Sequence, residues 1–324
     1  MSRSAALGAD LDHWLTPFLA VMGRNTRRRW GPLYLRGLWG PDCPKSVQPI
    51  AARLGLGGHD QLHHCVSSPS WDDTPLWRVL AERADAIVGG DDAVLVIDDT
   101  ALPKKGTLSV GVAPQYCGEL GKQANCQSLV SLTLARGEVP VPIGLRLFLP
   151  TSWTDDEARC AAAGVPETAR GALTKSEIAL GEIDRVRAAG IGFGCLVTDA
   201  GYGVSGPFRQ GLSARGLVWS VGIARTQTVF TTEVGLLFPR ARKGKPRSMP
   251  GPARTRRVQR TCSRAAVGGG LPGARAAKAR SPPASRPCVC GSPTGPAARA
   301  MATCPARRFG WSVNGAAAAS ANTT

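Results

Sequence analysis

The stretch AVLVIDDT, residues 93–100, decides the fold. It begins as a continuous apolar run of strand length and ends abruptly in Asp98, Asp99 and Thr100. An unbroken apolar strand is typical of the centre of a parallel or mixed sheet, where both faces are covered. We therefore expect a central strand that delivers two carboxylates at its end.

The two segments that follow predict a hairpin beside this strand. Residues 127–136 and 140–150 are separated by a short turn, and their apolar positions alternate, which favours two antiparallel strands. The predicted buried face holds five leucines: Leu132, Leu134, Leu145, Leu147 and Leu149.

A helix and a second buried strand come next. TKSE at residues 174–177 is a capping box, and the helix that it opens would bury Ala179, Ile183 and Val186. GCLVTD, residues 194–199, is again apolar and ends in an aspartate before a glycine turn. A helix over residues 205–215 and a strand over residues 217–224 complete the pattern. This element order is that of an RNase H-like α/β domain, which we expect over residues 91–238.

Residues 1–90 are expected to form a helical region. Its first helix is marked by apolar residues at three- and four-residue spacing: Leu11, Trp14, Leu15, Phe18, Leu19 and Met22. A second helix fits residues 47–54. A third begins at Thr74, because Pro75 suits the first helical position.

The positive charge is concentrated at the carboxyl end. The net charge is +17, yet all 23 Asp and Glu lie between Asp10 and Glu233, and 17 of the 40 Lys and Arg lie in residues 240–324. Residues 1–239 are thus neutral by formal count. Residues 239–324 are rich in Arg, Ala, Gly and Pro without apolar periodicity, so we expect this tail to be disordered.

Cysteine usage and hydropathy indicate the compartment. None of the ten cysteines stands in a CxxC pair, and several lie in apolar runs, so we expect reduced, buried thiols. No basic region precedes the first apolar stretch, and no apolar run approaches the ~20 residues that cross a bilayer. We expect a soluble, cytoplasmic protein without membrane contacts.

The strongest chemical constellation joins the two strand ends. In an RNase H-like sheet the strands that end at Asp99 and Asp199 are neighbours, so carboxylates far apart in sequence can share divalent ions. Magnesium prefers such oxygen ligands, and paired ions promote in-line displacement at a phosphodiester. The alternative is that Asp98 and Asp99 cap a strand and that Asp199 fills a turn. The two sites together favour the metal interpretation.

The same segments resemble a known family. VLVIDDTALPKKGTLSVGVAPQYCGELGKQANCQSLVSLTLA, VPIGLRLFLP, TKSEIAL and VTDAGYG are similar to the insertion-sequence transposases of the DDE superfamily, in the branch with IDDT followed by PKKG. The resemblance runs from near residue 10 to about residue 238. It implies a transposase that binds terminal inverted repeats, cleaves there with magnesium or manganese, joins the 3′-hydroxyl to target DNA, and self-associates.

The resemblance places the catalytic carboxylates on Asp99 and Asp199, with Asp98 as a neighbouring metal ligand. A glutamate on a later helix completes the family's set, but the one acidic residue after Asp199 is Glu233, which does not match that motif. The alternative function is therefore a truncated transposase that binds DNA and performs no chemistry.

The loss of acidic residues suggests a cause. Arg, Ala, Gly and Pro in abundance, with four late cysteines, are what a GC-rich gene yields when it is read out of frame. Our hypothesis is a frameshift between about residues 239 and 268.

Two groups of basic residues are candidate DNA contacts. Lys104, Lys105 and Lys122 fall in loops around the first strand, and Arg27, Arg28 and Arg29 precede Trp30 in a basic-aromatic patch. Solvated loops and helix ends explain these charges equally well.

Three histidines, in HDQLHHC at residues 59–65, invite a comparison with zinc sites. We reject zinc, because no second cluster completes a tetrahedral ligand set.

Overall fold

The computed structural model describes residues 3–40, 44–68, 71–224, 227, 236–237, 251–252 and 288–291. The helices are α1 (Arg3–Val21), α2 (Asn25–Trp39), α3 (Val47–Arg53), α4 (Asp60–Ser67), α5 (Thr74–Val88), α6 (Thr151–Thr154), α7 (Glu157–Ala162), a 3-10 turn (Glu167–Ala169), α8 (Lys175–Ala188), α9 (Ala200–Gly203) and α10 (Gly206–Ala214). The strands are β1 (Gly90–Pro103), β2 (Ala113–Cys117), β3 (Lys122–Arg136), β4 (Val139–Leu147), β5 (Phe193–Thr198), β6 (Trp219–Gly222), β7 (Leu236–Leu237), β8 (Gly251–Pro252) and β9 (Cys288–Gly291). Across these residues no helix combines the length and the apolar character needed to span a membrane.

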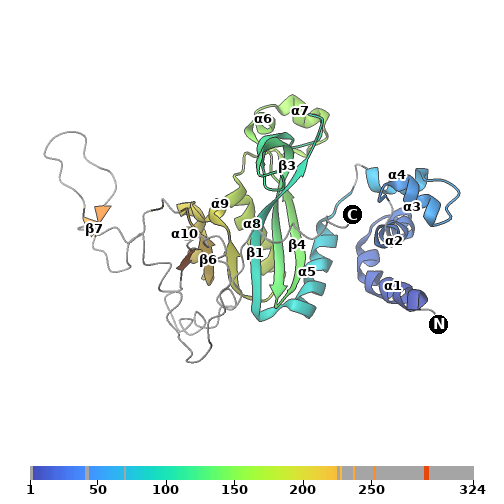
Figure 1. Ribbon diagram of the computed structural model, residues 1–324, viewed down its shortest axis with the longest axis horizontal. Helices are drawn as coiled ribbons and strands as arrows, with labels where there is room; N and C mark the ends of the chain where they lie inside the picture. The colour runs from blue at the N-terminus through green and yellow to red at the C-terminus, as the bar shows by residue number, and fades with distance from the viewer. Residues whose placement is uncertain are drawn as a thin grey trace, which may run out of the picture.

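A mixed sheet forms the centre of the molecule (Figure 1). Its strand order is β2-β3-β1-β5-β6-β9, and β4 pairs with β3. β1 runs antiparallel to β3 and parallel to β5, and β5 runs parallel to β6. Helices precede this sheet in the chain, as the sequence predicts, and the arrangement is consistent with an RNase H-like α/β fold.

The apolar run of β1 predicts a strand covered on both faces, but one face lies in the main core and the other is only half-buried. Ala93, Leu95 and Ile97 are fully buried in the main core, and the intervening Val94 and Val96 are half-buried. Burying a side chain such as leucine or isoleucine contributes about 1.5–3 kcal/mol. The central strand therefore gains most of its stability from the positions on its core face.

α8 packs on this sheet with the residues that the sequence analysis selects. Ala179, Ile183 and Val186 are fully buried in the main core. The predicted capping box is present: Thr174 Oγ1 accepts the amide of Glu177, and Glu177 Oε2 accepts the amide of Thr174. These bonds satisfy two amides that a helix start leaves open, and they fix where α8 begins.

The hairpin of β3 and β4 is confirmed, and Leu132 and Leu134 are buried as predicted, but the predicted buried face of β4 is wrong. A bulge shifts the register between Leu132 and Thr133, so that Leu132 lies opposite Gly144. Leu145 and Leu147 lie opposite Ser131 and Leu129, and so face away from the side of Leu132. The extra residue in the bulge reverses the alternation along β4; Ile143 is its fully buried apolar residue.

α5 packs against two sets of partners. Val79, with Leu76 and Leu80, packs with Leu15 and Phe18 of α1. The other part of its surface (Ala81, Ala84 and Val88) belongs to the main core over the sheet. Figure 1 shows α5 between the sheet and the group α1 to α4.

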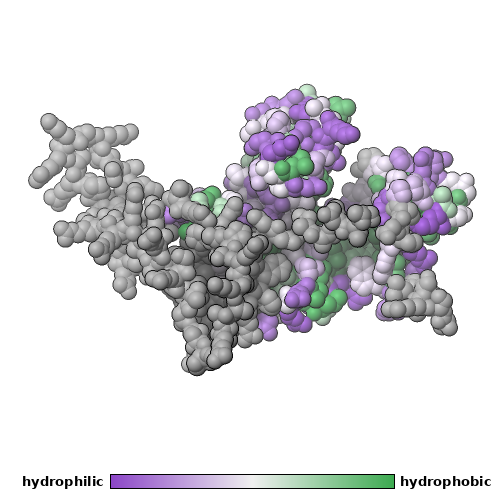
Figure 2. Space-filling view, viewed as in Figure 1, coloured by the Kyte–Doolittle hydropathy of each residue, from purple (hydrophilic) through white to green (hydrophobic). Residues whose placement is uncertain are grey.

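β1 continues beyond its paired aspartates into a ribbon. Its last residues pair with β3 as far as Pro103 opposite Cys126, and β2 pairs with the start of β3. α6 and α7 pack at this end: Trp153 is 1% exposed, and its Nε1 donates to the Val112 carbonyl over 2.8 Å. Figure 2 shows that the surface at this end is mostly hydrophilic.

Within the predicted disordered tail, residues 239–324, the structure describes two short strands. β8 pairs with β7, and β9 pairs antiparallel with β6 at the sheet edge. The other residues of the tail, and Glu233, lie outside the described residues.

Candidate active site at the ends of β1 and β5

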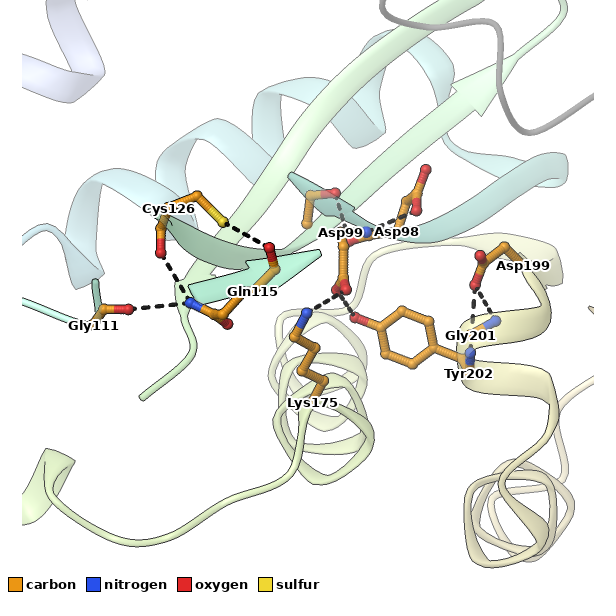
Figure 3. Close-up of polar contacts among 10 residues, drawn as sticks. Asp98, Asp99, Gly111, Gln115, Cys126, Lys175, Asp199, Gly201 and Tyr202 are labelled. Carbon is orange, nitrogen blue, oxygen red and sulfur yellow. Dashed lines mark hydrogen bonds and ion pairs between the residues drawn. The ribbon is translucent and has the colours of Figure 1, made fainter. Parts of the chain in front are cut away.

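The parallel register of β1 and β5 brings the predicted carboxylates to one edge. Ile97 pairs with Thr198, so Asp98 and Asp199 are the next residues on adjacent strands. Asp99 follows on β1. Figure 3 shows these three aspartates around the start of α9.

Asp99 is bound through both of its carboxylate oxygens. Lys175 Nζ donates to Asp99 Oδ2 over 2.6 Å, and the Tyr202 hydroxyl donates to Asp99 Oδ1 over 2.6 Å (Figure 3). Lys175 is the first residue of α8, and Tyr202 belongs to α9. Side chains 76 and 103 residues further along the chain therefore converge on this carboxylate of β1.

Asp199 caps the short helix that follows β5. Its Oδ1 accepts the amide of Gly201 over 2.8 Å and that of Tyr202 over 3.4 Å. The turn lies tightly against β6, because a Cβ atom at position 203 would overlap the carbonyl oxygen of Gly222. Glycine at position 203 thus allows the close approach that orients the Asp199 carboxylate.

Asp98 is half-buried, and its Oδ1 accepts the amide of Asp99 over 2.7 Å. Burial raises its pKa to about 6, the Asp99 amide opposes the rise, and the negative charges of Asp199 and Asp99 add to it. The three carboxylates are thus close enough for their charges to interact. Burial also raises the pKa of Tyr202, and the negative charge of Asp99 raises it further. The phenol therefore stays protonated and can donate its hydrogen bond to Asp99.

The described residues do not complete the predicted set of ligands. Among the described residues, no group of three His, Cys, Asp or Glu side chains forms a ready metal site. No described residue after Asp199 is acidic. Asp98, Asp99 and Asp199 nevertheless fit a hard divalent cation by the chemistry of their donor atoms.

The three candidate lysines lie on the ribbon beyond Asp99. Lys104 and Lys105 are exposed in the turn after β1, and Lys122 is exposed at the start of β3. Asn125 fixes this turn, because its Nδ2 donates to the carbonyls of Lys104 and Gly106 over 2.9 and 2.8 Å. The turn therefore presents its charges from a defined backbone.

The three candidate arginines of α2 differ from one another. Arg28 and Arg29 are exposed. Arg27 is 8% exposed, and its guanidinium lies 4.3 Å from the ring centre of Trp71. The expectation that Arg27 contacts DNA does not agree with this placement, because stacking on the indole covers its charge.

Sequence reasoning does not single out Lys175 and Tyr202. Both stand inside motifs that it does use, TKSEIAL and VTDAGYG, where the lysine follows a helix cap and the tyrosine lies in a glycine turn. A polar side chain next to a cap or in a strand-end turn is the signal that could have identified them.

Comparison with known proteins gives two findings. The family model described as DDE superfamily endonuclease matches residues 17–280. The probable transposase for insertion sequence element IS701 of Microchaete diplosiphon is 28% identical over 164 residues, which cover 50% of this chain. The matched part spans 40% of the length of that relative.

Proposed function

The chain belongs to the DDE superfamily endonucleases, and on that premise we propose that it is an insertion-sequence transposase, which cleaves DNA at the ends of its element and joins the freed 3′-hydroxyl to target DNA. The observation that supports this most directly is the alignment of Asp98 and Asp99 with Asp199 on adjacent parallel strands. Carboxylates brought together at strand ends are suited to phosphodiester chemistry.

Endonucleases of this superfamily generally use divalent metal ions. In this chain Asp99 and Asp199, with Asp98 beside them, would hold magnesium or manganese. When bound, the ion supplies positive charge that activates the attacking oxygen and stabilises the leaving oxygen.

The protein's own groups prepare this edge. Tyr202, which is 3% exposed, fixes the direction of the Asp99 carboxylate through its hydroxyl. The amides of α9 hold Asp199 in the same way. Oriented ligands lose little conformational freedom when they bind a cation.

DNA contacts are proposed on two surfaces. Lys104, Lys105 and Lys122 lie on the ribbon that continues from the Asp99 edge, where phosphates of a bound strand would pass. Arg28 and Arg29 provide a second basic surface in the helical region. Self-association and a cytoplasmic location belong to the same proposal. The five described cysteines are all buried, as expected of reduced thiols, and this supports the cytoplasmic location.

A second candidate function is DNA binding without cleavage. The observation that favours it is the missing third carboxylate, since Glu233 is the one acidic residue after Asp199. A metal held without the family's later glutamate would support strand cleavage weakly.

A cleavage assay separates the two functions. The full chain is incubated with magnesium and a duplex that carries the flanks of its own gene, and nicked strands are resolved on a denaturing gel. If the protein is an enzyme, nicks should appear with the unaltered chain and disappear in Asp99→Asn and Asp199→Asn. They should persist in Asp92→Asn, an exposed control on β1. A retarded band on a parallel native gel, without nicks on the denaturing gel, supports the binding protein. Nicks that survive Asp99→Asn contradict the proposed site.

The frameshift is proposed as the cause of the missing carboxylate. The family match ends at residue 280, past the change of composition at residue 239, so the test must cover this whole interval. The encoding DNA is translated in its other two frames. The proposal requires one of them to encode a helix with the missing glutamate.

A further inference from the structure

Asp99 is engaged by two donors of different character. The Lys175 side chain is 30% exposed and reaches Oδ2 with a charged ammonium group. Tyr202 is buried, and its ring packs 5.6 Å from that of Phe208, so its hydroxyl comes from a fixed position. A flexible lysine chain can move into solvent, whereas a packed tyrosine cannot.

The position of Lys175 is not explained by helix stability. It is the first residue of α8, where the helix dipole disfavours a cation. What compensates for this is outside the helix: the Asp99 carboxylate, and the Phe148 ring, whose centre lies 5.3 Å from Nζ. The ammonium group therefore lies at a position where the negative charge of Asp99 stabilises a cation.

We propose that Lys175 is a positioning residue that occupies the cation position at Asp99 and competes there with the divalent ion. When an ion binds, the ammonium group leaves Oδ2, while Tyr202 remains on Oδ1 and keeps the carboxylate oriented. This inference rests on the proposed function, because it assumes that Asp99 is a metal ligand.

The two partners of Asp99 then have opposite effects on metal affinity. Removing Lys175 abolishes the competitor and its repulsion of the ion. Removing the Tyr202 hydroxyl loosens the ligand and leaves the competitor in place. A role limited to holding the fold together would instead weaken metal binding in both variants.

The test measures binding of Mn²⁺ to the full chain by the electron paramagnetic resonance signal of the free ion. We expect Lys175→Met to bind about 3- to 10-fold more tightly than the unaltered chain, since half-exposed ion pairs have modest strength. Lys175→Arg keeps the charge and should keep the original affinity. Tyr202→Phe should bind more weakly, and Arg187→Met, an exposed control in the last turn of α8, should show no change.

Each other result has a defined meaning. Equal or weaker Mn²⁺ binding by Lys175→Met overturns the inference while leaving the metal site intact. If neither the unaltered chain nor Lys175→Met binds Mn²⁺, the proposed function itself fails. Should Lys175→Met not fold, as judged by circular dichroism, an unchanged affinity of Tyr202→Phe overturns the scheme.

Discussion

Glu182 on α8 accepts a 2.6 Å hydrogen bond from Nε of Arg146 on β4, and this ion pair ties the helix that carries Lys175 to the sheet. Arg185 completes the network, with its Nε 2.8 Å from Glu182 Oε2. The glutamate side chain is 8% exposed. Its negative charge is thus balanced by two guanidinium groups.

Glu182→Ala should lower the free energy of unfolding by about 2–3 kcal/mol, because it leaves two partly buried cations without their partner. Urea unfolding followed by circular dichroism measures the change. Glu82→Ala, which breaks the exposed pair of Arg78 and Glu82, is the matched control and should cost less than about 1 kcal/mol. Equal effects of the two variants would contradict the role of the network.

Thr174→Ala removes the helix cap next to Lys175. We expect a loss of about 1 kcal/mol in the free energy of unfolding, since the amide of Glu177 loses its acceptor. Thr174→Ser keeps the oxygen and should retain most of the stability. Thermal unfolding of the three proteins provides the measurement, and a serine variant as unstable as the alanine variant would refute the cap.

Gly203→Ala should destabilise the turn that carries Asp199, because the new methyl group would overlap the backbone of Gly222. An overpacked site of this kind costs about 1–3 kcal/mol. Gly181→Ala on α8 is the opposite control: nothing lies near its Cβ position, so alanine should stabilise the helix by up to about 1 kcal/mol. Urea midpoints that fall equally for both variants would disprove the close approach.

The ion pair of Asp184 and Arg215 predicts a dependence of stability on pH. Hydrogen bonds from Arg215 hold the pKa of Asp184 below its usual value of 3.8. Because the folded pKa is the lower one, the stabilisation is present above pH 3.8 and is lost as the pH falls through the folded value. Because the Asp184 side chain is half-exposed, the stabilisation from this ion pair should stay under about 1 kcal/mol. Unfolding of Asp184→Asn and the unaltered chain should differ at pH 6 and converge at lower pH.

The turn at Lys104 and Lys105 predicts a salt-dependent contact. Replacing both lysines with glutamine should weaken DNA binding and reduce the slope of log affinity against log salt by about 2. Asn125→Ala leaves the charge unchanged but removes the bonds that fix the turn. It should weaken binding with little change in slope. Fluorescence anisotropy across a salt series tests both, and an unchanged double variant would exclude this surface.

Sequence patterns predicted the elements that local chemistry determines. The apolar runs of β1 and β5 and the cap at Thr174 were sufficient to place both aspartates at one edge. The bulge at Leu132 escaped prediction, because one extra residue changes a strand's facing without changing its composition. Arg27 was mistaken for a surface residue because its cover, Trp71, is distant in sequence. Lys175 was missed for the same reason, since its partner lies 76 residues earlier.

The double packing of α5 has a consequence for dividing the chain. A fragment that started at residue 91 would lack Ala81, Ala84 and Val88, and the apolar surface of the sheet that they cover would be exposed to water. Cutting ahead of Thr74 instead would keep that core closed and expose the α1 side of the helix around Val79. A fragment that carries the candidate site should therefore begin in the segment between α4 and α5, with Leu76, Val79 and Leu80 made polar to replace the lost neighbour.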